Sequence, residues 1–521
     1  MGINFSAGKI LNQKEILALL LCLLIGFALR FYTFDQKSLW MDEIYTFNDS
    51  RYDIKDQLKY YKGNPAYLHP PLFFILTHQF YPFTKPERDL RIIPLIFGTL
   101  SIPMIYFLSR SFSPSIAFPC ALSLTFMAYH ISLSQDARFY TFLMFFGMVS
   151  LYFFMKYLKT LERKYLILVA LSFTIPFYTH YSGIPFIVLC QLLWFYRIDE
   201  RDTTPHLYPV SILNGFFLLI SLPWVAFVAF NSKVSILKTG LVGSQETVSF
   251  WNLLYQTFHD WLPNGPLMAG SGILLILLPF LSKHKRNGFF LLLLVLLPMG
   301  GVYLFCKLFH VVHFVSSRYF ICFLPLFLVS IYFSLDAIEA RFQRLNRLKV
   351  IFLIFFLASN LMMLPFYYRS EKQDYRGLVT YLKEQLHDGD KIVAGNAVYI
   401  GIMLHYFGIY PDGRQYVIPG FKVSENEIEN RFFLDYRGNK FTILSSQSHW
   451  FKYLVDGSRL WIVADKTNAK IVKQRLSSSV LKGYFDGSFF GMKKFPEDAS
   501  IYLFLWDPKS PGEKGIDMPI D

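Results

Sequence analysis

The chain has 521 residues, of which 53% are hydrophobic, 19% aromatic and only 17% charged, and its mean hydropathy is +0.34. This composition excludes a soluble globular protein and is typical of an α-helical protein that crosses the membrane many times. The formal net charge of +14 does not indicate nucleic-acid binding, because much of it lies in short loops between apolar stretches.

About eleven apolar stretches have the length and composition of membrane-spanning helices. The first is predicted to remain as an anchor, because its apolar run is longer than that of a signal peptide and no small-residue cleavage site follows it. The five cysteines lie in apolar stretches without a CxxC partner, so we predict no disulfide framework and no zinc site. The predicted spans are residues 16–34, 90–108, 115–132, 139–158, 165–178, 183–196, 208–230, 266–281, 288–305, 319–335 and 350–367.

Lysine and arginine in the short loops predict the orientation of the chain. With the N-terminus in the cytoplasm, the short outside loops hold only Arg138, Lys307 and Arg318. The inside segments hold Lys9, Lys14, Arg110, Lys156, Lys159, Arg163, Lys164, Arg197, Arg201, Lys283, Lys285, Arg286, Arg341, Arg344, Arg347 and Lys349. The first loop (35–89), the loop 231–265 and everything after about residue 368 are therefore predicted to lie outside the cytoplasm.

The first outside loop contains His69-Pro70-Pro71-Leu72, followed by an apolar stretch to Phe83. That stretch is too short for a span, so we expect a helix lying in the membrane interface.

After about residue 368 the character of the sequence changes. Residues 381–386 have helical spacing and end in a turn at Asp388-Gly389-Asp390. Residues 391–394 and 460–464 have the pattern of short buried strands. We therefore predict a transmembrane domain, residues 1–368, and a small extracytoplasmic α/β domain, residues 369–521.

Acids, arginines and histidines gather on the predicted outer side of the membrane. Asp42 and Glu43 follow the first span, and an acid at the membrane surface can take a proton from an attacking hydroxyl. Arginine supplies a bidentate fork that suits a lipid phosphate. The other candidate site residues are His69, Asp136, Arg138, His180, Tyr181 and Arg318.

Each of these residues also has a purely structural interpretation. Asp42 would cap a helix, and Asp136 would form an interfacial ion pair with Arg138. Arg318 would extend to lipid headgroups, and the histidines would belong to turn structure only. Their common side of the membrane favours a functional site.

Several motifs occur together in the first 340 or so residues. They are Trp40-Met41-Asp42-Glu43, His69-Pro70-Pro71-Leu72, Arg91-Ile92-Ile93-Pro94, Gln135-Asp136-Ala137-Arg138, Thr179-His180-Tyr181 and Arg318-Tyr319 with a following Leu324-Pro325. In this order they resemble the bacterial branch of the GT-C superfamily. More narrowly, they resemble the dolichyl-phosphate-mannose-protein mannosyltransferase-like family, which also includes the lipid A aminoarabinose transferases. The sequence Asp374-Tyr375-Arg376-Gly377 is similar to the corresponding opening in many bacterial members.

The resemblance implies an inverting glycosyltransferase of the bacterial inner membrane. It would move a sugar from a polyprenyl-phosphate donor to an extracytoplasmic acceptor, such as lipid A or lipopolysaccharide core, a protein or another glycan. Asp42 matches the catalytic base, and Glu43 matches a neighbour that holds the acceptor or orients the site. Arg138 and Arg318 match basic positions near the donor phosphate, and some members carry glutamate where Asp136 stands.

No cofactor follows from the resemblance. Asp42 and Glu43 together offer two carboxylates to a divalent metal, but members with monophosphate donors usually dispense with one, so we do not expect a metal.

Two other functions remain open. A transporter or flippase of a lipid-linked glycan should have two related halves, discontinuous helices and charges at mid-membrane. The sequence has neither an internal repeat nor an acid in the middle of a span, which favours the enzyme. A glycan ligase or polymerase with a diphosphate-linked donor would be favoured by a metal requirement.

Overall fold

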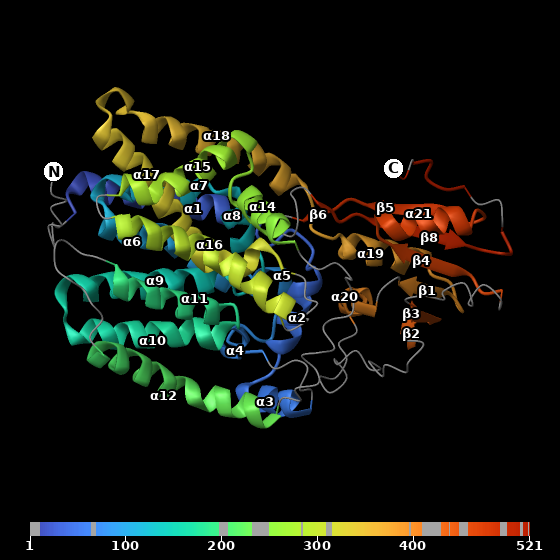
Figure 1. Cartoon of the computed structure of the whole chain (residues 1–521). Helices are drawn as coiled ribbons and strands as arrows, with labels where there is room; N and C mark the ends of the chain where they lie inside the picture. The colour runs from blue at the N-terminus through green and yellow to red at the C-terminus, as the bar shows by residue number, and fades with distance from the viewer. Residues whose placement is uncertain are drawn as a thin grey trace.

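The computed structural model describes residues 11–63, 69–196, 207–231, 249–282, 285–308, 315–394, 397–408, 429–436, 438–446, 457–489, 497–510, 514–518 and 520. A bundle of long helices forms one end of the molecule, and a sheet with flanking helices forms the other (Figure 1). The helices before the sheet are α1 (Gln13–Phe31), α2 (Met41–Asp49), α3 (Ile54–Gly63), α4 (Leu72–His78), α5 (Pro86–Asp89), α6 (Ile92–Phe112), α7 (Ala117–Phe126), α8 (Ala128–Ser134), α9 (Tyr140–Thr160), α10 (Arg163–Thr179), α11 (Gly183–Cys190), α12 (Leu207–Asn231), α14 (Phe250–Trp261), α15 (Gly265–Leu281), α16 (Lys285–Leu308), α17 (Leu324–Arg341) and α18 (Leu348–Arg369).

Within the described ranges, six helices are long and apolar enough to cross a membrane. Eight spans result if two bent pairs, α7 with α8 and α14 with α15, each count as one. The other predicted spans are α1, α10 and α11, which are helices but are charged or short. α1 carries Lys14, Glu15 and Arg30, and α10 and α11 have 17 and 8 residues. The multi-pass helical fold is confirmed, whereas the number eleven stays a prediction.

The bend of 60° between α7 and α8 is stabilised by side chains from two other helices. A broken helix leaves backbone groups unpaired on both sides of the break. Arg30 of α1 is fully buried, and its guanidinium donates to the carbonyls of Leu124 (2.8 Å) and Thr125 (3.1 Å) at the end of α7. Asn360 of α18 accepts a hydrogen bond from the amide of Ala128 at 2.9 Å. α8 therefore begins in a new direction with its first amide paired.

The predicted first outer loop (35–89) contains α2 to α5, which lie at the end of the bundle that faces the sheet (Figure 1). The apolar stretch expected as an interfacial helix forms only the seven-residue α4. Phe73 of α4 is fully buried, and its ring lies 6.3 Å from that of Phe139 and 6.2 Å from that of Phe142. α4 thus packs into the bundle core.

The residues after α18 form a six-stranded sheet in the order β2-β3-β1-β4-β8-β5. β1 pairs in parallel with β3 and β4, and the other pairs are antiparallel. The strands and helices here are α19 (Tyr375–Gln385), β1 (Lys391–Ala394), α20 (Ala397–Phe407), β2 (Glu429–Tyr436), β3 (Asn439–Ser446), β4 (Leu460–Ala464), α21 (Lys466–Arg475), β5 (Val480–Phe485), β6 (Ser488–Phe489), β7 (Glu497–Asp498) and β8 (Ile501–Trp506). β1 and β4 coincide with the two predicted strands.

Helices cover both faces of this sheet. Along β4, Trp461 and Val463 pack in one core with α19 and α20, and Leu460 and Ile462 pack in another with α21. A strand buried on both faces reads as a continuous apolar run, which explains why β4 could be predicted from the sequence. The predicted domain boundary, after residue 368, falls in the last turn of α18.

Candidate active site

Asp42 lies in the first turn of α2, beside both arginines singled out from the sequence. Its Oδ2 accepts a hydrogen bond from Arg318 Nη1 at 3.2 Å, and its backbone carbonyl accepts one from Arg138 Nη1 at 3.1 Å. Its Oδ1 makes no hydrogen bond to the described residues, and the side chain is 18% exposed. The site therefore has a carboxylate oxygen available to a ligand, between two guanidinium groups.

The two arginines are held differently. Arg318 is buried, and its guanidinium lies 5.0 Å from the ring centroid of Trp40 and 5.3 Å from that of Tyr140. Arg138 donates from Nη1 to Thr46 Oγ1 at 3.2 Å, but its buried Nε has no hydrogen-bond partner among the described residues. Burial alone would lower the pKa of Arg138, but the Asp42 carboxylate raises it above its usual value. Arg138 is therefore a charged donor with unused capacity.

Glu43, the next residue of α2, is fully buried. Arg91 donates a hydrogen bond to each of its oxygens, from Nε to Oε1 at 2.7 Å and from Nη2 to Oε2 at 2.8 Å. The backbone amide of Ala137 also donates to Oε1, at 2.7 Å. Lys372 Nζ lies 3.2 Å from the same Oε1. Burial would raise the pKa of Glu43, but Arg91 and Lys372 outweigh it and lower the pKa to about 2. Glu43 is thus an ionised, buried carboxylate that connects Arg91, Lys372 and the backbone of Ala137.

Asp136 also belongs to this buried group. Its Oδ1 accepts from Trp40 Nε1 at 2.9 Å and from Lys372 Nζ at 3.0 Å. Burial raises the pKa of Asp136, and Lys372 only partly offsets that rise. The ion-pair partner of Asp136 in the described chain is thus Lys372, and the considered pair with Arg138 is not formed.

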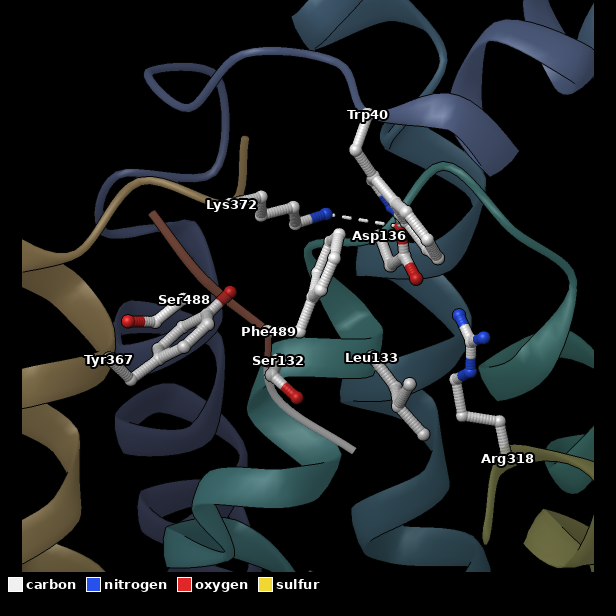
Figure 2. A pocket seen from close by; sticks show the side chains of 9 residues that line it. All are labelled: Trp40, Ser132, Leu133, Asp136, Arg318, Tyr367, Lys372, Ser488 and Phe489. Atoms are coloured by element: carbon white, nitrogen blue, oxygen red, sulfur yellow. Dashed lines mark hydrogen bonds and ion pairs between the residues drawn. The ribbon is translucent and has the colours of Figure 1, made fainter. Parts of the chain in front are cut away.

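A small pocket opens beside these groups (Figure 2). Its walls come from the bundle, from the segment after α18 and from β6. The lining residues are Trp40, Ser132, Leu133, Asp136, Arg318, Tyr367, Lys372, Ser488 and Phe489.

The remaining predicted residues form an adjoining aromatic group. The ring of His180 stacks on that of Phe139, with centroids 4.1 Å apart and planes at 18°. His69 lies 6.5 Å away, nearly parallel to His180, and Tyr181 lies at the same distance with its ring tilted. Arg138 joins the two groups, because its guanidinium lies 5.1 Å from the Phe139 ring. Among the described residues, no three His, Cys, Asp or Glu side chains are grouped to hold a metal ion.

Two residues of the charged network were not predicted as site residues. Arg91 stands in a motif noted above without a role, and all five of its N–H donors are used: two on Glu43 and the others on the carbonyls of Phe34, Lys37 and Ser38. Lys372 lies just after the predicted domain boundary. The motif was the one feature of the sequence that pointed to Arg91 as a site residue, and no feature of the sequence pointed to Lys372.

Comparison with known proteins supports the earlier resemblance. Residues 68–227 match the model of the family described as dolichyl-phosphate-mannose-protein mannosyltransferase. That range includes His69, Asp136, Arg138 and His180, whereas Asp42 and Arg318 lie outside it. No curated protein matches the chain in sequence.

Two solved structures of the same protein match over most of the chain. The structure of ArnT from Cupriavidus metallidurans in the apo state has a TM-score of 0.52 at 10% identity and covers 94% of this chain and 97% of that one. ArnT bound to undecaprenyl phosphate gives 0.47 at 12% identity with the same coverage. The S. cerevisiae Pmt1-Pmt2 complex bound to the sugar donor gives 0.33 at 17% identity and covers 49% of this chain and 38% of that chain. The resemblance predicted from the sequence is therefore confirmed: residues 68–227 match the model of the dolichyl-phosphate-mannose-protein mannosyltransferase family, and the chain is similar in fold to ArnT.

Proposed function

We propose that this protein is an integral-membrane glycosyltransferase that moves a sugar from a polyprenyl-phosphate-linked donor to an acceptor hydroxyl on the outer face of the membrane. The observation that carries the proposal is the grouping of Asp42, Arg138 and Arg318. It joins a carboxylate with one unpaired oxygen to two cationic side chains, one of which has an unpaired buried Nε. The family match supports a donor of the dolichyl-phosphate-mannose class.

The reaction follows from the charges of these three groups. Asp42 takes the proton of the acceptor hydroxyl, and the acceptor oxygen forms a bond to the anomeric carbon. The bond from that carbon to the phosphate oxygen breaks, and its electron pair leaves with the phosphate. Arg138 and Arg318 stabilise the extra charge on the departing polyprenyl phosphate. A single displacement of this kind inverts the anomeric configuration.

The other candidate residues have supporting roles in this proposal. Glu43 orients the site, because both of its oxygens are engaged by Arg91 and buried away from any acceptor. Asp136 fixes Trp40 beside Arg318. His69, His180 and Tyr181 form an aromatic wall next to Arg138, where the sugar ring can stack.

The test is a transfer assay on purified protein in nanodiscs. Synthetic polyprenyl-phosphate sugars serve as donors and an extract of envelope glycolipids serves as acceptor. Release of polyprenyl phosphate together with sugar on the acceptor supports the proposal. Movement of intact donor across the bilayer without cleavage favours the flippase, and cleavage only of a diphosphate-linked donor in the presence of a divalent metal favours the ligase.

Replacing Arg138 by alanine should weaken donor binding. A charge-assisted hydrogen bond is worth about 1.5–3 kcal/mol, so donor affinity should fall by roughly 10- to 100-fold, and lysine at this position should restore only part of it because the fork is lost. Binding of a fluorescent polyprenyl phosphate measures the effect. Arg110→Ala is the control, because Arg110 lies at the far end of α6 and contacts Tyr106 and Glu15. Normal donor affinity in folded Arg138→Ala protein would make Arg138 a structural residue.

The proposed site also requires a specific topology, with the C-terminal domain outside the cytoplasm. Reporter fusions after Lys164 and Arg286 should be cytoplasmic, because basic residues dominate those segments, and fusions within 231–265 or after residue 400 should be outside. Paired phosphatase and fluorescent-protein fusions at each position give opposite readings and control for expression. A cytoplasmic C-terminal domain would contradict the proposal, since α2, which carries Asp42, shares a hydrophobic core with that domain.

A further inference from the structure

The segment that leads into α2 is bound to the C-terminal domain by hydrogen bonds. The amide of Leu39 donates to Tyr406 Oη at 2.6 Å, and the amide of Ser38 donates to Glu371 Oε2 at 2.9 Å. The hydroxyl of Ser38 donates to Asp374 Oδ1 at 3.1 Å. Each partner lies more than 300 residues further along the chain, so the C-terminal domain helps to hold the loop before Asp42, together with Arg91 of the bundle.

α2 itself shares a hydrophobic core with that domain. Phe47 of α2 lies edge to face with the ring of His405 in α20, at 4.6 Å between centroids. The bundle side of this core consists of Leu39, Ile44, Phe47, Leu90 and Ala137, and the C-terminal side includes Leu378, Val379, Leu382, Ile402 and Met403. The face of α2 that carries Ile44 and Phe47 is therefore covered by the C-terminal domain.

Lys372 connects this interface to the charged network of the site. It lies between α18 and α19, and its side chain is only 10% exposed. Its ammonium group lies 3.0 Å from Asp136 Oδ1, 3.2 Å from Glu43 Oε1 and 3.3 Å from the carbonyl of Gln135 (Figure 2 shows the contact with Asp136). The ammonium group donates hydrogen bonds to Asp136 and Gln135 and forms an ion pair with Glu43. Lys372 is thus held by buried acceptors of the site.

We propose that Lys372 is a positioning residue through which the C-terminal domain holds the catalytic helix α2 against the turn between α8 and α9. Glu43 belongs to α2 and Asp136 to that turn, and an oxygen of each lies within 3.2 Å of Lys372 Nζ. Two buried carboxylates so close to one point repel each other unless a cation lies between them. Lys372 supplies that cation from a third segment. This inference rests on the proposed function only in so far as α2 carries the catalytic base.

The experiment compares full-length wild type with Lys372→Met, which keeps the length of the side chain and removes its charge. Hydrogen–deuterium exchange of peptides covering α2 should speed up by at least about tenfold, the change that corresponds to losing one hydrogen bond to a charged group. Turnover in the transfer assay should fall by a similar factor while donor affinity stays within a few-fold of wild type. Lys482→Met is the matched control, because Lys482 donates to the carbonyl of Lys514 within the C-terminal domain, away from the site.

A double variant separates positioning from simple charge balance. The double variant Lys372→Met with Asp136→Asn has no buried, unpaired carboxylate at position 136. Folding should therefore recover if the single variant Lys372→Met folds poorly. Exchange at α2 should stay fast and turnover low, because the link to Glu43 is still missing. Wild-type exchange at α2 in the single variant, or full recovery of turnover in the double one, would overturn the proposal. Exchange at α2 does not depend on any activity, so a chain that is not a glycosyltransferase still gives a clear answer about Lys372.

Discussion

Asp42→Asn should lower turnover by about two to four orders of magnitude, the usual contribution of a positioned general base. The amide keeps the size of the carboxylate, and its oxygen can still accept the hydrogen bond from Arg318 that Oδ2 accepts in the wild type at 3.2 Å. It cannot take the proton of the acceptor, however. Donor affinity should change little, because the phosphate is bound by the arginines.

The measurement is the transfer rate at saturating donor, with binding of polyprenyl phosphate determined on the same preparation. The control is Asp53→Asn, an acid in the same predicted loop whose carboxylate accepts from the amide of Asp56. If Asp42→Asn retains turnover within a few-fold of wild type, Asp42 is not the base. The flippase interpretation, which needs no base at this position, would then gain support.

Arg91→Met should have the largest effect on stability. Both Arg91 and Glu43 have side chains at most 1% exposed, so the substitution leaves a buried carboxylate without its main partner. Breaking a buried ion pair in this way costs about 3–5 kcal/mol. The variant also leaves three carbonyls without a donor in the loop before α2. We expect poor recovery of folded protein and a clear drop in thermal stability in detergent.

Arg88→Met provides a matched control three residues earlier. Arg88 pairs with Asp89 at 2.7 Å, but its side chain is 41% exposed, and such pairs contribute about 1 kcal/mol or less. Adding Glu43→Gln to Arg91→Met should recover much of the stability, since no buried charge then remains alone. Equal thermal stability of Arg91→Met and Arg88→Met would contradict the conclusion that the buried pair of Arg91 and Glu43 stabilises the fold.

Much of the fold could be predicted from the sequence because it depends on local patterns. Apolar runs of about 20 residues indicate spans, and a short apolar run such as β4 indicates a strand buried on both faces. Prediction was poorer where one segment bends without a local cause. The break between α7 and α8 has no proline at it, and its causes, Arg30 and Asn360, lie in helices distant in the sequence.

The candidate site was predicted in part for the same reason. The acids and arginines that lie together were recognisable by their residue types and their common predicted side of the membrane. Their partners were not, since Arg91 meets Glu43 across 48 residues and Lys372 meets Asp136 across 236. Hydrophobic periodicity carries no information about pairs at such separations. The proposed division of roles, with Asp42 as the catalytic base and Glu43 as a structural carboxylate, likewise depends on burial that adjacent residues do not reveal.

The capped break between α7 and α8 bears on ion coupling. Sodium- and proton-coupled carriers use the exposed backbone ends of discontinuous helices to coordinate the driving ion at mid-membrane. Here the carbonyls of Leu124 and Thr125 already accept hydrogen bonds from a guanidinium, and the amide of Ala128 is paired with Asn360. The fixed positive charge of Arg30 would also repel a cation at close range in a medium of low dielectric constant. The backbone groups at this break are therefore already engaged within the protein, and they do not form the kind of cation site with which such carriers couple transport to an ion gradient.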